Sequence, residues 1–374
     1  MKLVFQNKNR TNKISSQTAG LNQLRAFTSA TPSSVKFSAG ALAFILLASH
    51  ASAAPFFFST GNPDGKIATL SRPTSPGKIQ TETADDFVVT NSVVINQATF
   101  TGLLPLGATP ETVQNVEIEI YQKFPGDSDT NRVPTVPTRA NSPGDFEIDD
   151  ATRDGLDGSL SFATTIVNPS FTASNSVVTG IHPSPLQFTS GEGPVTGTEV
   201  MLSVTFNPPI ALPPGQYFFR PEVASASGDF FWLSAPKPIL APGTPFAADL
   251  QSWIRNDALA PDWLRIGTDI THQGPFNAAF ALAGETDADG DGVADSADQC
   301  AGTPAGAIVD ANGCSIDQLA PCDGPASGGS WKSHGQYVSA VAQAAEAFLE
   351  QGLITSDQAD QIVSSAARSS CGSK

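Results

Sequence analysis

The sequence predicts a mainly β protein, in which a β-sandwich or jelly-roll-like domain is followed by an irregular acidic segment and a small α-helical hairpin. Three patterns support this fold class. From about residue 54 to 285, short runs alternate between apolar and polar residues and are separated by Gly- and Pro-rich turns. Aspartates crowd into 287–298. Apolar residues recur at helical spacing near the C-terminus.

Residues 1–53 have the composition of a secretory signal peptide. They contain six basic residues and no acidic one, and the apolar run 41–48 precedes the small-x-small sequence Ala51-Ser52-Ala53. The run is too short to span a bilayer, and the pattern is typical of a cleaved export signal. We therefore expect a mature chain that starts near Ala54 and is secreted, extracellular or at the cell surface, with the periplasm as an alternative.

The charge of the remaining chain disfavours several classes of partner. Without the six basic residues of 1–53, 14 Lys and Arg face 36 Asp and Glu, which gives a net charge of −22. This balance argues against nucleic acid and anionic membranes and favours cations and basic surfaces. No later segment is long and apolar enough to cross a membrane. The expected partner is an unknown surface or matrix component, and a glycan is one candidate.

Within 54–285, alternation places apolar side chains on one face of each predicted strand. The clearest examples are 116–121 (VEIEIY), 200–206 (VMLSVTF) and 276–282 (FNAAFAL). Short strands of this kind with Pro and Gly turns are typical of sandwiches and jelly rolls. The stretch 250–267 fits a short helix or a structured loop, and we expect Trp253 and Trp263 to be packing residues.

No catalytic pattern is visible in this domain, so we expect that the protein is not an enzyme. The histidines lack zinc-site spacing, and no Gly-x-Ser-x-Gly sequence occurs. Asp85 and Asp86 are adjacent, and neighbouring side chains in a strand point to opposite faces. We expect them to be solvated at a strand edge or to form a second cation site at the sandwich rim. Carboxylate catalysis on a carbohydrate stays open, because glycosidase carboxylates come from distant sequence positions.

The sequence DADGDGVADSADQC, residues 287–300, predicts a calcium site, and we call 287–298 the aspartate loop. Its oxygen donors fall at positions one, three, five, seven, nine and twelve, which is the spacing of an EF-hand-type loop. Gly292 stands at position six, where a sharp turn is required, and position twelve is Asp in place of Glu. The predicted Ca²⁺ ligands are Asp287, Asp289, Asp291, the Val293 carbonyl, Asp295 and Asp298.

A second, partial ion site is one interpretation of Asp310 and Asn312, which precede Gly313. The alternative interpretation is an Asx-type turn that leads into the next cysteine. The residues themselves do not distinguish the two.

All four cysteines lie in the last quarter of the chain, which predicts two disulfides in an exported protein. Three pairings are possible. We favour Cys300–Cys314 and Cys322–Cys371, because each bridge then closes one compact unit. The β-domain has no cysteine and must be held by its own core.

Residues from about 335 to 368 are predicted to form a helical hairpin. Apolar residues recur at helical spacing on both sides of Gly352, which fits the glycine that ends a helix. Thr355 and Gln358 have the spacing of a capping box for the second helix.

The segment 287–314 resembles a thrombospondin type 3 repeat, in the bacterial form also found as a linker in OmpA-like outer-membrane proteins. The Asp/Gly pattern and both cysteines carry this resemblance. It implies that the aspartates bind Ca²⁺ and that the segment has little regular secondary structure. Adhesive thrombospondins carry many repeats, whereas this chain has one full repeat and a fragment. The β-domain resembles uncharacterised exported bacterial β-sandwich proteins, which implies no particular activity.

We therefore expect four parts: a signal peptide (1–53), a β-sandwich domain (54–285), a calcium-binding repeat (286–321) and a disulfide-clamped helical hairpin (322–374). The expected function is that of an exported calcium-binding protein with a structural or adhesive role. The alternative is a carbohydrate-binding or carbohydrate-cleaving jelly roll with structural calcium.

Overall fold

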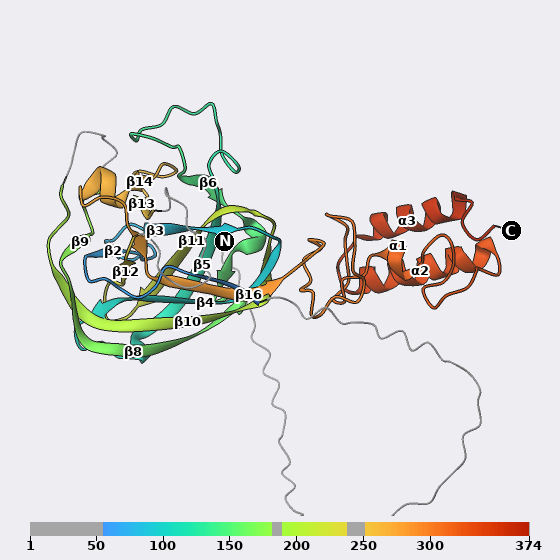
Figure 1. The fold of residues 1–374 in the computed structure, drawn as a ribbon, viewed down its shortest axis with the longest axis horizontal. Helices are drawn as coiled ribbons and strands as arrows, with labels where there is room; N and C mark the ends of the chain where they lie inside the picture. Colours follow the sequence, from blue (N-terminus) through green and yellow to red (C-terminus); the bar gives the residue numbers. More distant parts are fainter. Residues whose placement is uncertain (1–54, 182–188, 238–250, 374) are drawn as a thin grey trace, which may run out of the picture. The chain divides into compact units, whose positions relative to one another are not determined.

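A computed structural model describes residues 55–181, 189–237 and 251–373. The predicted signal peptide lies outside these ranges, and so does His182, one of the histidines that lack zinc-site spacing. The described chain is mainly β: two β-sheets form a sandwich, and a small helical part follows at the C-terminal end (Figure 1). This confirms the predicted fold class.

The first sheet has nine strands in the described chain, and its main path runs β1-β16-β4-β12-β2-β9. β10 pairs with β4 and β8, and β15 pairs with β12; all pairs are antiparallel except β2–β9. The strands are β1 (Pro55–Ser59), β2 (Ile67–Leu70), β4 (Val93–Pro105), β8 (Leu160–Ala173), β9 (Asn175–Val177), β10 (Val195–Leu212), β12 (Phe231–Ala235), β15 (Asn277–Ala278) and β16 (Phe280–Thr286).

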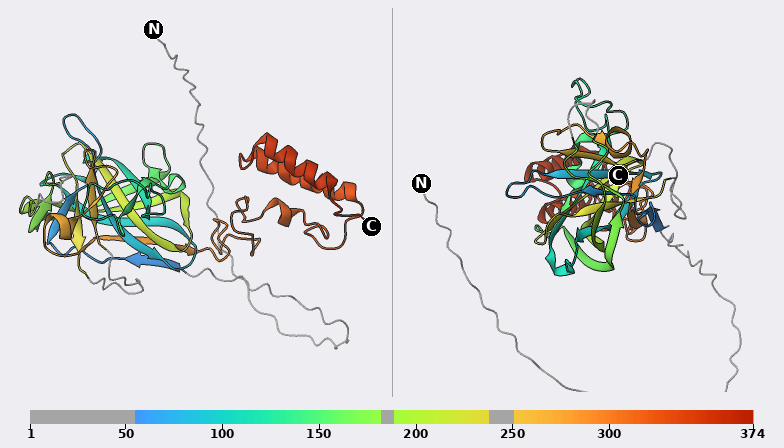
Figure 2. Two further views of the ribbon diagram at one scale, coloured as in Figure 1. Left: turned by 90° about the horizontal axis from the view of Figure 1, so that it is seen from above. Right: turned by 90° about the vertical axis from the view of Figure 1, so that its left-hand side faces the viewer.

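The second sheet has seven strands in the same described ranges, ordered β14-β13-β3-β11-β5-β6, with β7 paired to β5. These strands are β3 (Thr81–Val89), β5 (Val113–Lys123), β6 (Pro143–Glu147), β7 (Arg153–Asp154), β11 (Gly215–Ser225), β13 (Trp253–Asn256) and β14 (Leu264–Arg265). Three single turns of helix connect the strands: η1 (Pro110–Thr112), η2 (Asp149–Ala151) and the π-helical η3 (Ile266–Ile270). Figure 2 shows the two layers of strands from two further directions.

The core of the sandwich is built from large aromatic side chains of both sheets. Phe219 of β11 stacks on Phe280 of β16 with 5.2 Å between ring centroids, and Trp232 of β12 meets both rings edge-on. Trp232 also donates its indole N–H to the Ala279 carbonyl at 3.0 Å. Buried aromatic residues carry much of the apolar area of a core, and no disulfide of the described chain lies in this domain.

The described part of the predicted helix or loop at 250–267, residues 251–267, contains a β-hairpin. β13 pairs with both β14 and β3, and η3 begins where β14 ends. Trp253 and Trp263 are each 1% exposed and pack with Tyr121 and Phe218 on the outer face of the seven-stranded sheet. The prediction that both tryptophans are packing residues is confirmed.

The expectation that Asp85 and Asp86 are solvated at a strand edge is wrong. β3 lies inside its sheet between β13 and β11, and both aspartates are buried. Asp85 accepts a hydrogen bond from the Ala278 N–H at 2.7 Å, and Asp86 accepts one from the Gln251 N–H at 2.8 Å. Burial, with the charge of Asp86, raises the pKa of Asp85. The order of strands in the sheet decides whether Asp85 and Asp86 are buried, and a local sequence pattern does not reveal that order.

The C-terminal part contains α1 (Ile316–Leu319), α2 (His334–Glu350) and α3 (Ser356–Arg368), and α2 packs on α3 as the predicted hairpin. Thr355 and Gln358 form the predicted capping box. The hydrophobic core of this unit starts before the hairpin, because Ile316 and Ala320 pack with Phe348 and its neighbours. In the described part of the chain, no helix is both long and apolar enough to cross a membrane.

Both disulfides have the favoured pairing. Cys300 pairs with Cys314, and Cys322 pairs with Cys371, which joins the two ends of the helical unit. Small units bury little apolar surface and depend on such bridges. Disulfides are typical of proteins that fold in an oxidising compartment outside the cytoplasm.

Candidate metal centre

The aspartate loop is attached directly to the end of the first sheet. The Asp287 N–H donates to the Ser92 carbonyl at 3.1 Å, and the Asp295 N–H donates to the Thr286 carbonyl at 3.0 Å. Thr286 is the last residue of β16, and Ser92 immediately precedes β4. The position of the loop's first residue is therefore fixed by two neighbouring strands.

Three carboxylates converge within this loop. Asp287, Asp289 and Asp291 each offer one oxygen, and these oxygens lie within 4.8 Å of one another. Asp287 is only 3% exposed. The second oxygen of Asp291 (Oδ2) is buried and has no hydrogen-bond partner. A buried carboxylate oxygen without a donor is costly in a protein, so this oxygen is suited to hold a cation.

Two glycines create the turn that brings backbone donors to Asp287. Gly290 and Gly292 have φ angles of 77° and 95°, which residues with a Cβ rarely adopt. Their N–H groups donate to the two oxygens of Asp287 at 2.8 and 2.9 Å. The Val293 N–H donates to Asp291 Oδ1 at 2.8 Å. The backbone thus offsets part of the negative charge that the loop concentrates.

Asp298 approaches the same group from the far side of the loop. A Cβ on Gly313 would lie 2.2 Å from Asp298 Oδ1 and 3.0 Å from Asp291 Oδ2. Both carboxylates therefore face the same small space beside Gly313. Asp298 Oδ1 also accepts from the Cys300 N–H at 2.7 Å.

Asp295 has a different position from the three clustered carboxylates. One of its oxygens accepts from the Ala288 N–H at 2.7 Å, and the other accepts from the Thr286 hydroxyl at 2.6 Å. Both oxygens therefore bind the segment where strand β16 passes into the loop. In this arrangement Asp295 positions the loop.

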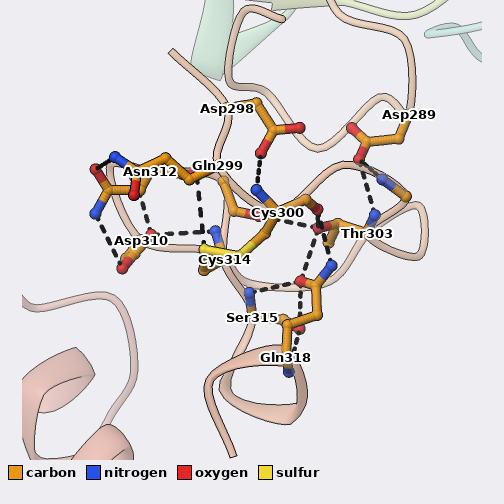
Figure 3. Close-up of a disulfide and its surroundings, with 12 residues drawn as sticks. Asp289, Asp298, Gln299, Cys300, Thr303, Asp310, Asn312, Cys314, Ser315 and Gln318 are labelled. Atoms are coloured by element: carbon orange, nitrogen blue, oxygen red, sulfur yellow. Dashed lines mark hydrogen bonds between the residues drawn. A yellow bond between two sulfur atoms is a disulfide. The ribbon is translucent and has the colours of Figure 1, made fainter. Parts of the chain in front are cut away.

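The first disulfide closes the segment 300–314, and backbone N–H groups of this segment bind Asp289 (Figure 3). Asp289 Oδ2 accepts from the Gly302 N–H at 2.6 Å and the Thr303 N–H at 2.8 Å. The Thr303 hydroxyl lies 3.0 Å from the Cys300 carbonyl and 2.9 Å from the Gly313 carbonyl. The segment closed by Cys300 and Cys314 thus supplies the two backbone donors to one of the three clustered carboxylates.

Asp310 and Asn312 form a turn beside this bridge and are not among the three clustered carboxylates. Asp310 Oδ1 accepts from the Asn312 N–H at 2.9 Å and from the Cys314 N–H at 3.1 Å. The Asn312 side chain accepts from the amide of Gln299 at 3.0 Å. These bonds have the pattern of an Asx-type turn.

Electrostatics in the aspartate loop favour a bound cation. Burial raises the pKa of Asp287 and of Asp291, and the charge of Asp289 adds to both shifts, while backbone N–H donors oppose them. The donor set consists of oxygens, with carboxylates dominant, which suits Ca²⁺ better than softer metals. The residues present therefore fit a calcium ion.

A second cluster of charged side chains was not expected from the sequence. Arg220 of β11 is fully buried on the outer face of the seven-stranded sheet. Its guanidinium contacts four carboxylates: Glu82 at 2.9 Å, Glu222 at 3.0 Å, Glu117 at 3.1 Å and Glu119 at 3.4 Å. The alternation in VEIEIY places two of these glutamates on one face of a strand, but it does not reveal that this face is partly buried around Arg220.

The environment moves the pKa values of two of these glutamates in opposite directions. Burial alone would raise the pKa of Glu82, but Arg220 and Arg255 lower it to about 2. Burial raises the pKa of Glu119 to about 7; Arg220 opposes this shift, and a hydrogen bond with Glu117 adds to it. Tyr121 donates its hydroxyl to Glu119 at 2.7 Å.

Comparisons with known proteins give one short similarity. An alpha-agarase from Thalassotalea agarivorans is 48% identical to the chain over 54 residues, which is 14% of this chain and 3% of the agarase. No protein family matches the chain, and no solved structure matches it. The chain spans only a small fraction of the agarase, and the matched length is much shorter than the β-sandwich.

Replacement of Asp295 tests whether this residue positions the loop or binds the ion directly. Asp295→Asn should weaken the hydrogen bonds to Ala288 and Thr286, at a local cost of about 1–3 kcal/mol, because each involves a charged acceptor. Hydrogen exchange at the Ala288 amide should then become faster. Asp291→Asn is the matched variant and should reduce Ca²⁺ affinity more strongly. Equal losses of Ca²⁺ affinity in the two variants would contradict a positioning role.

The raised pKa of Glu119 predicts a pH dependence of stability. The folded chain holds this proton up to about pH 7, whereas the unfolded chain releases it near its ordinary value of 4.5. The free energy of unfolding should therefore fall as pH rises through this window, by up to about 1.4 kcal/mol per pH unit from this group.

Urea unfolding between about pH 5 and about pH 8, followed by tryptophan fluorescence, measures this slope. Glu119→Gln should flatten the slope, and Glu346→Gln on the exposed face of α2 is the control. An unchanged slope in Glu119→Gln would show that other groups cause the pH dependence.

Proposed function

We propose that this chain is an exported calcium-binding protein, in which Ca²⁺ rigidifies the acidic segment between a β-sandwich and a disulfide-clamped helical unit. The observation that carries the proposal is the convergence of three aspartates with the buried, unpartnered Oδ2 of Asp291. The resemblance of 287–314 to a thrombospondin type 3 repeat supports the same ion.

Asp287, Asp289 and Asp291 would hold the ion, and Asp298 would reach it from beside Gly313. The three clustered carboxylates repel one another, and their backbone donors offset this repulsion only in part. Ca²⁺ supplies the positive charge that reverses the sign of this interaction. The loop starts at strand β16, and the disulfide-closed segment 300–314 binds Asp289, so the rigidity of the loop would extend to both neighbouring segments.

We infer a structural or adhesive role at the cell surface or outside the cell. The two disulfides are typical of an oxidising compartment, and the residues after the predicted signal peptide carry a net charge of −22. Such a surface favours cations and basic partners. A rigid calcium-bound joint would also resist proteolysis, because proteases cleave exposed and mobile segments.

The similarity to an alpha-agarase supports a second candidate, a protein that binds or cleaves a polysaccharide. In that case calcium would stabilise the chain, and the glycan would bind elsewhere. Beside Arg220, the pKa of Glu82 is lowered and that of Glu119 is raised. Many acid–base sites contain two carboxyl groups whose pKa values differ in this way.

Calcium titration of the mature chain, residues 54–374, tests the first candidate. We expect saturable binding with a dissociation constant between about 10⁻⁶ and 10⁻³ M, and a higher melting temperature at saturating Ca²⁺, because the ion binds only the folded loop. The double variant Asp289→Ala/Asp291→Ala should lose this binding.

The matched control is Asp357→Ala/Asp360→Ala, which removes the same charge from the exposed surface of α3. It should bind Ca²⁺ as the unmodified chain does. Absence of saturable binding in the oxidised, unmodified chain would overturn the proposal, and so would equal binding by the Asp289→Ala/Asp291→Ala variant.

The second candidate predicts that the mature chain is retarded in native gels that contain agarose or a related galactan, or that it releases new reducing ends from them. The Asp289→Ala/Asp291→Ala variant should behave the same at saturating glycan, because its loop is not the glycan site. Migration that is independent of the glycan, with no new reducing ends, would remove this candidate.

A further inference from the structure

Strand β8 forms a long free edge of the nine-stranded sheet. It has 14 residues and pairs with β10, and no other strand of the described chain pairs with it. Figure 1 shows β8 on the outer side of β10. An edge strand presents a row of backbone N–H and C=O groups that can pair with another strand.

The other edges of the two sheets are short. Among the described strands, the remaining strands that pair on one side alone are β1, β6, β7, β9, β14 and β15, which have two to five residues each. Short edge strands are one way in which proteins avoid pairing with other chains. β8 does not have this protection.

The sequence of β8 also lacks the usual charged protection. LSFATTIVNPSFTA contains no Lys, Arg, Asp or Glu. Pro169 and irregular pairing near Asn168 interrupt its C-terminal half, whereas residues 160–166 pair in regular register with β10. The regular half therefore offers an edge that is both continuous and uncharged.

Apolar side chains on this edge are exposed. Ile166 is 41% exposed and Val167 is 55% exposed. The stretch 161–167, SFATTIV, combines β-branched and aromatic residues with no charge, Gly or Pro. Such stretches are typical of strands that pair with copies of themselves.

Charge favours a second copy of the chain at this edge. Two chains with a net charge of −22 repel over most of their surfaces, but β8 adds no charge to that repulsion. A strongly basic partner would gain nothing from an uncharged strand and would bind elsewhere. A second copy meets no like-charged pair along this strand.

The side chains of β8 are also complementary to themselves. Phe162, Thr164 and Ile166 share one face, because they lie opposite the core-facing residues Val204, Leu202 and Val200 of β10. In an antiparallel pair centred on Thr164, Phe162 of each copy lies opposite Ile166 of the other, and the two Thr164 residues face each other. Aromatic–β-branched and Thr–Thr pairs stabilise antiparallel sheets.

We propose that β8 is a self-association surface, through which two copies of this chain pair edge to edge in antiparallel orientation about a twofold axis at Thr164. The two nine-stranded sheets would then form one continuous sheet. Such an interface is isologous and closes after two copies. The self-association proposal goes beyond the proposed function and does not depend on calcium. Self-association and calcium binding can therefore be disproved separately.

Sedimentation velocity of the mature chain, from low to high micromolar concentration, tests this proposal. We expect a concentration-dependent dimer in EDTA as well as in Ca²⁺. Thr165 is exposed on the regular half of β8, and Thr165→Lys should weaken the dimer by at least about tenfold, because lysine on an edge strand opposes pairing.

The matched control is Thr205→Lys on β10. Thr205 is also exposed, but both of its neighbouring strand positions are already occupied, by Ser161 of β8 and Gln97 of β4. This variant should dimerise as the unmodified chain does. Thermal melts of both variants establish that the fold is retained, and Val167→Lys replaces Thr165→Lys if the latter melts early.

Hydrogen exchange of the unmodified chain gives a second measurement. Amides within 160–167 should exchange more slowly at high protein concentration than at low concentration. A chain that stays monomeric throughout overturns the proposal, and so does a dimer that both Thr165→Lys and Val167→Lys leave intact. Binding of an extended peptide at this edge without dimerisation would also overturn it.

Discussion

Carboxylate repulsion within the aspartate loop is the constraint on which the last quarter of the chain depends. Three side chains of like charge lie within 4.8 Å, and an irregular segment has few backbone partners for its own N–H groups. Hydrogen bonds between these N–H groups and the carboxylates reduce the repulsion and satisfy the backbone at the same time. The N–H groups of Gly290 and Gly292 bind Asp287, and those of Gly302 and Thr303 bind Asp289. Asp291 keeps one buried oxygen without a donor, so the residual repulsion is concentrated where a cation would relieve it.

The two ends of this loop are held by different physical means. Strand β16 holds the first end through the sandwich, whose aromatic core needs no covalent bridge. The other end leads into a helical unit that is too small to bury a large core, and here disulfides and capping boxes provide the stability. Calcium at the loop would therefore act on the irregular segment between two units that each have a hydrophobic core.

Local patterns predicted what depends on neighbouring residues, and they failed where distant segments decide. VEIEIY identified β5 and its core-facing residues, but the burial of Glu119 depends on Arg220 and on side chains more than a hundred residues away. Asp85 and Asp86 were misjudged for the same reason, since β13 covers the edge that β3 was expected to have. In the aspartate loop, the three clustered carboxylates are also the three closest in sequence. Asp295 binds the strand end instead, and ligand spacing alone contains no information on where Thr286 points.

Charge links the calcium site and the β8 edge only weakly, which keeps the two proposals separable. Each bound Ca²⁺ would add two positive charges to the net charge of −22, and this would lower the repulsion between two copies of the chain. At physiological ionic strength, however, exposed charges are screened beyond about 8 Å. Pairing at β8 is decided within that distance by backbone hydrogen bonds and by side chains such as Phe162 and Ile166. Calcium would therefore change the rigidity of each copy far more than the affinity between copies, and a dimer would carry two independently stiffened acidic segments.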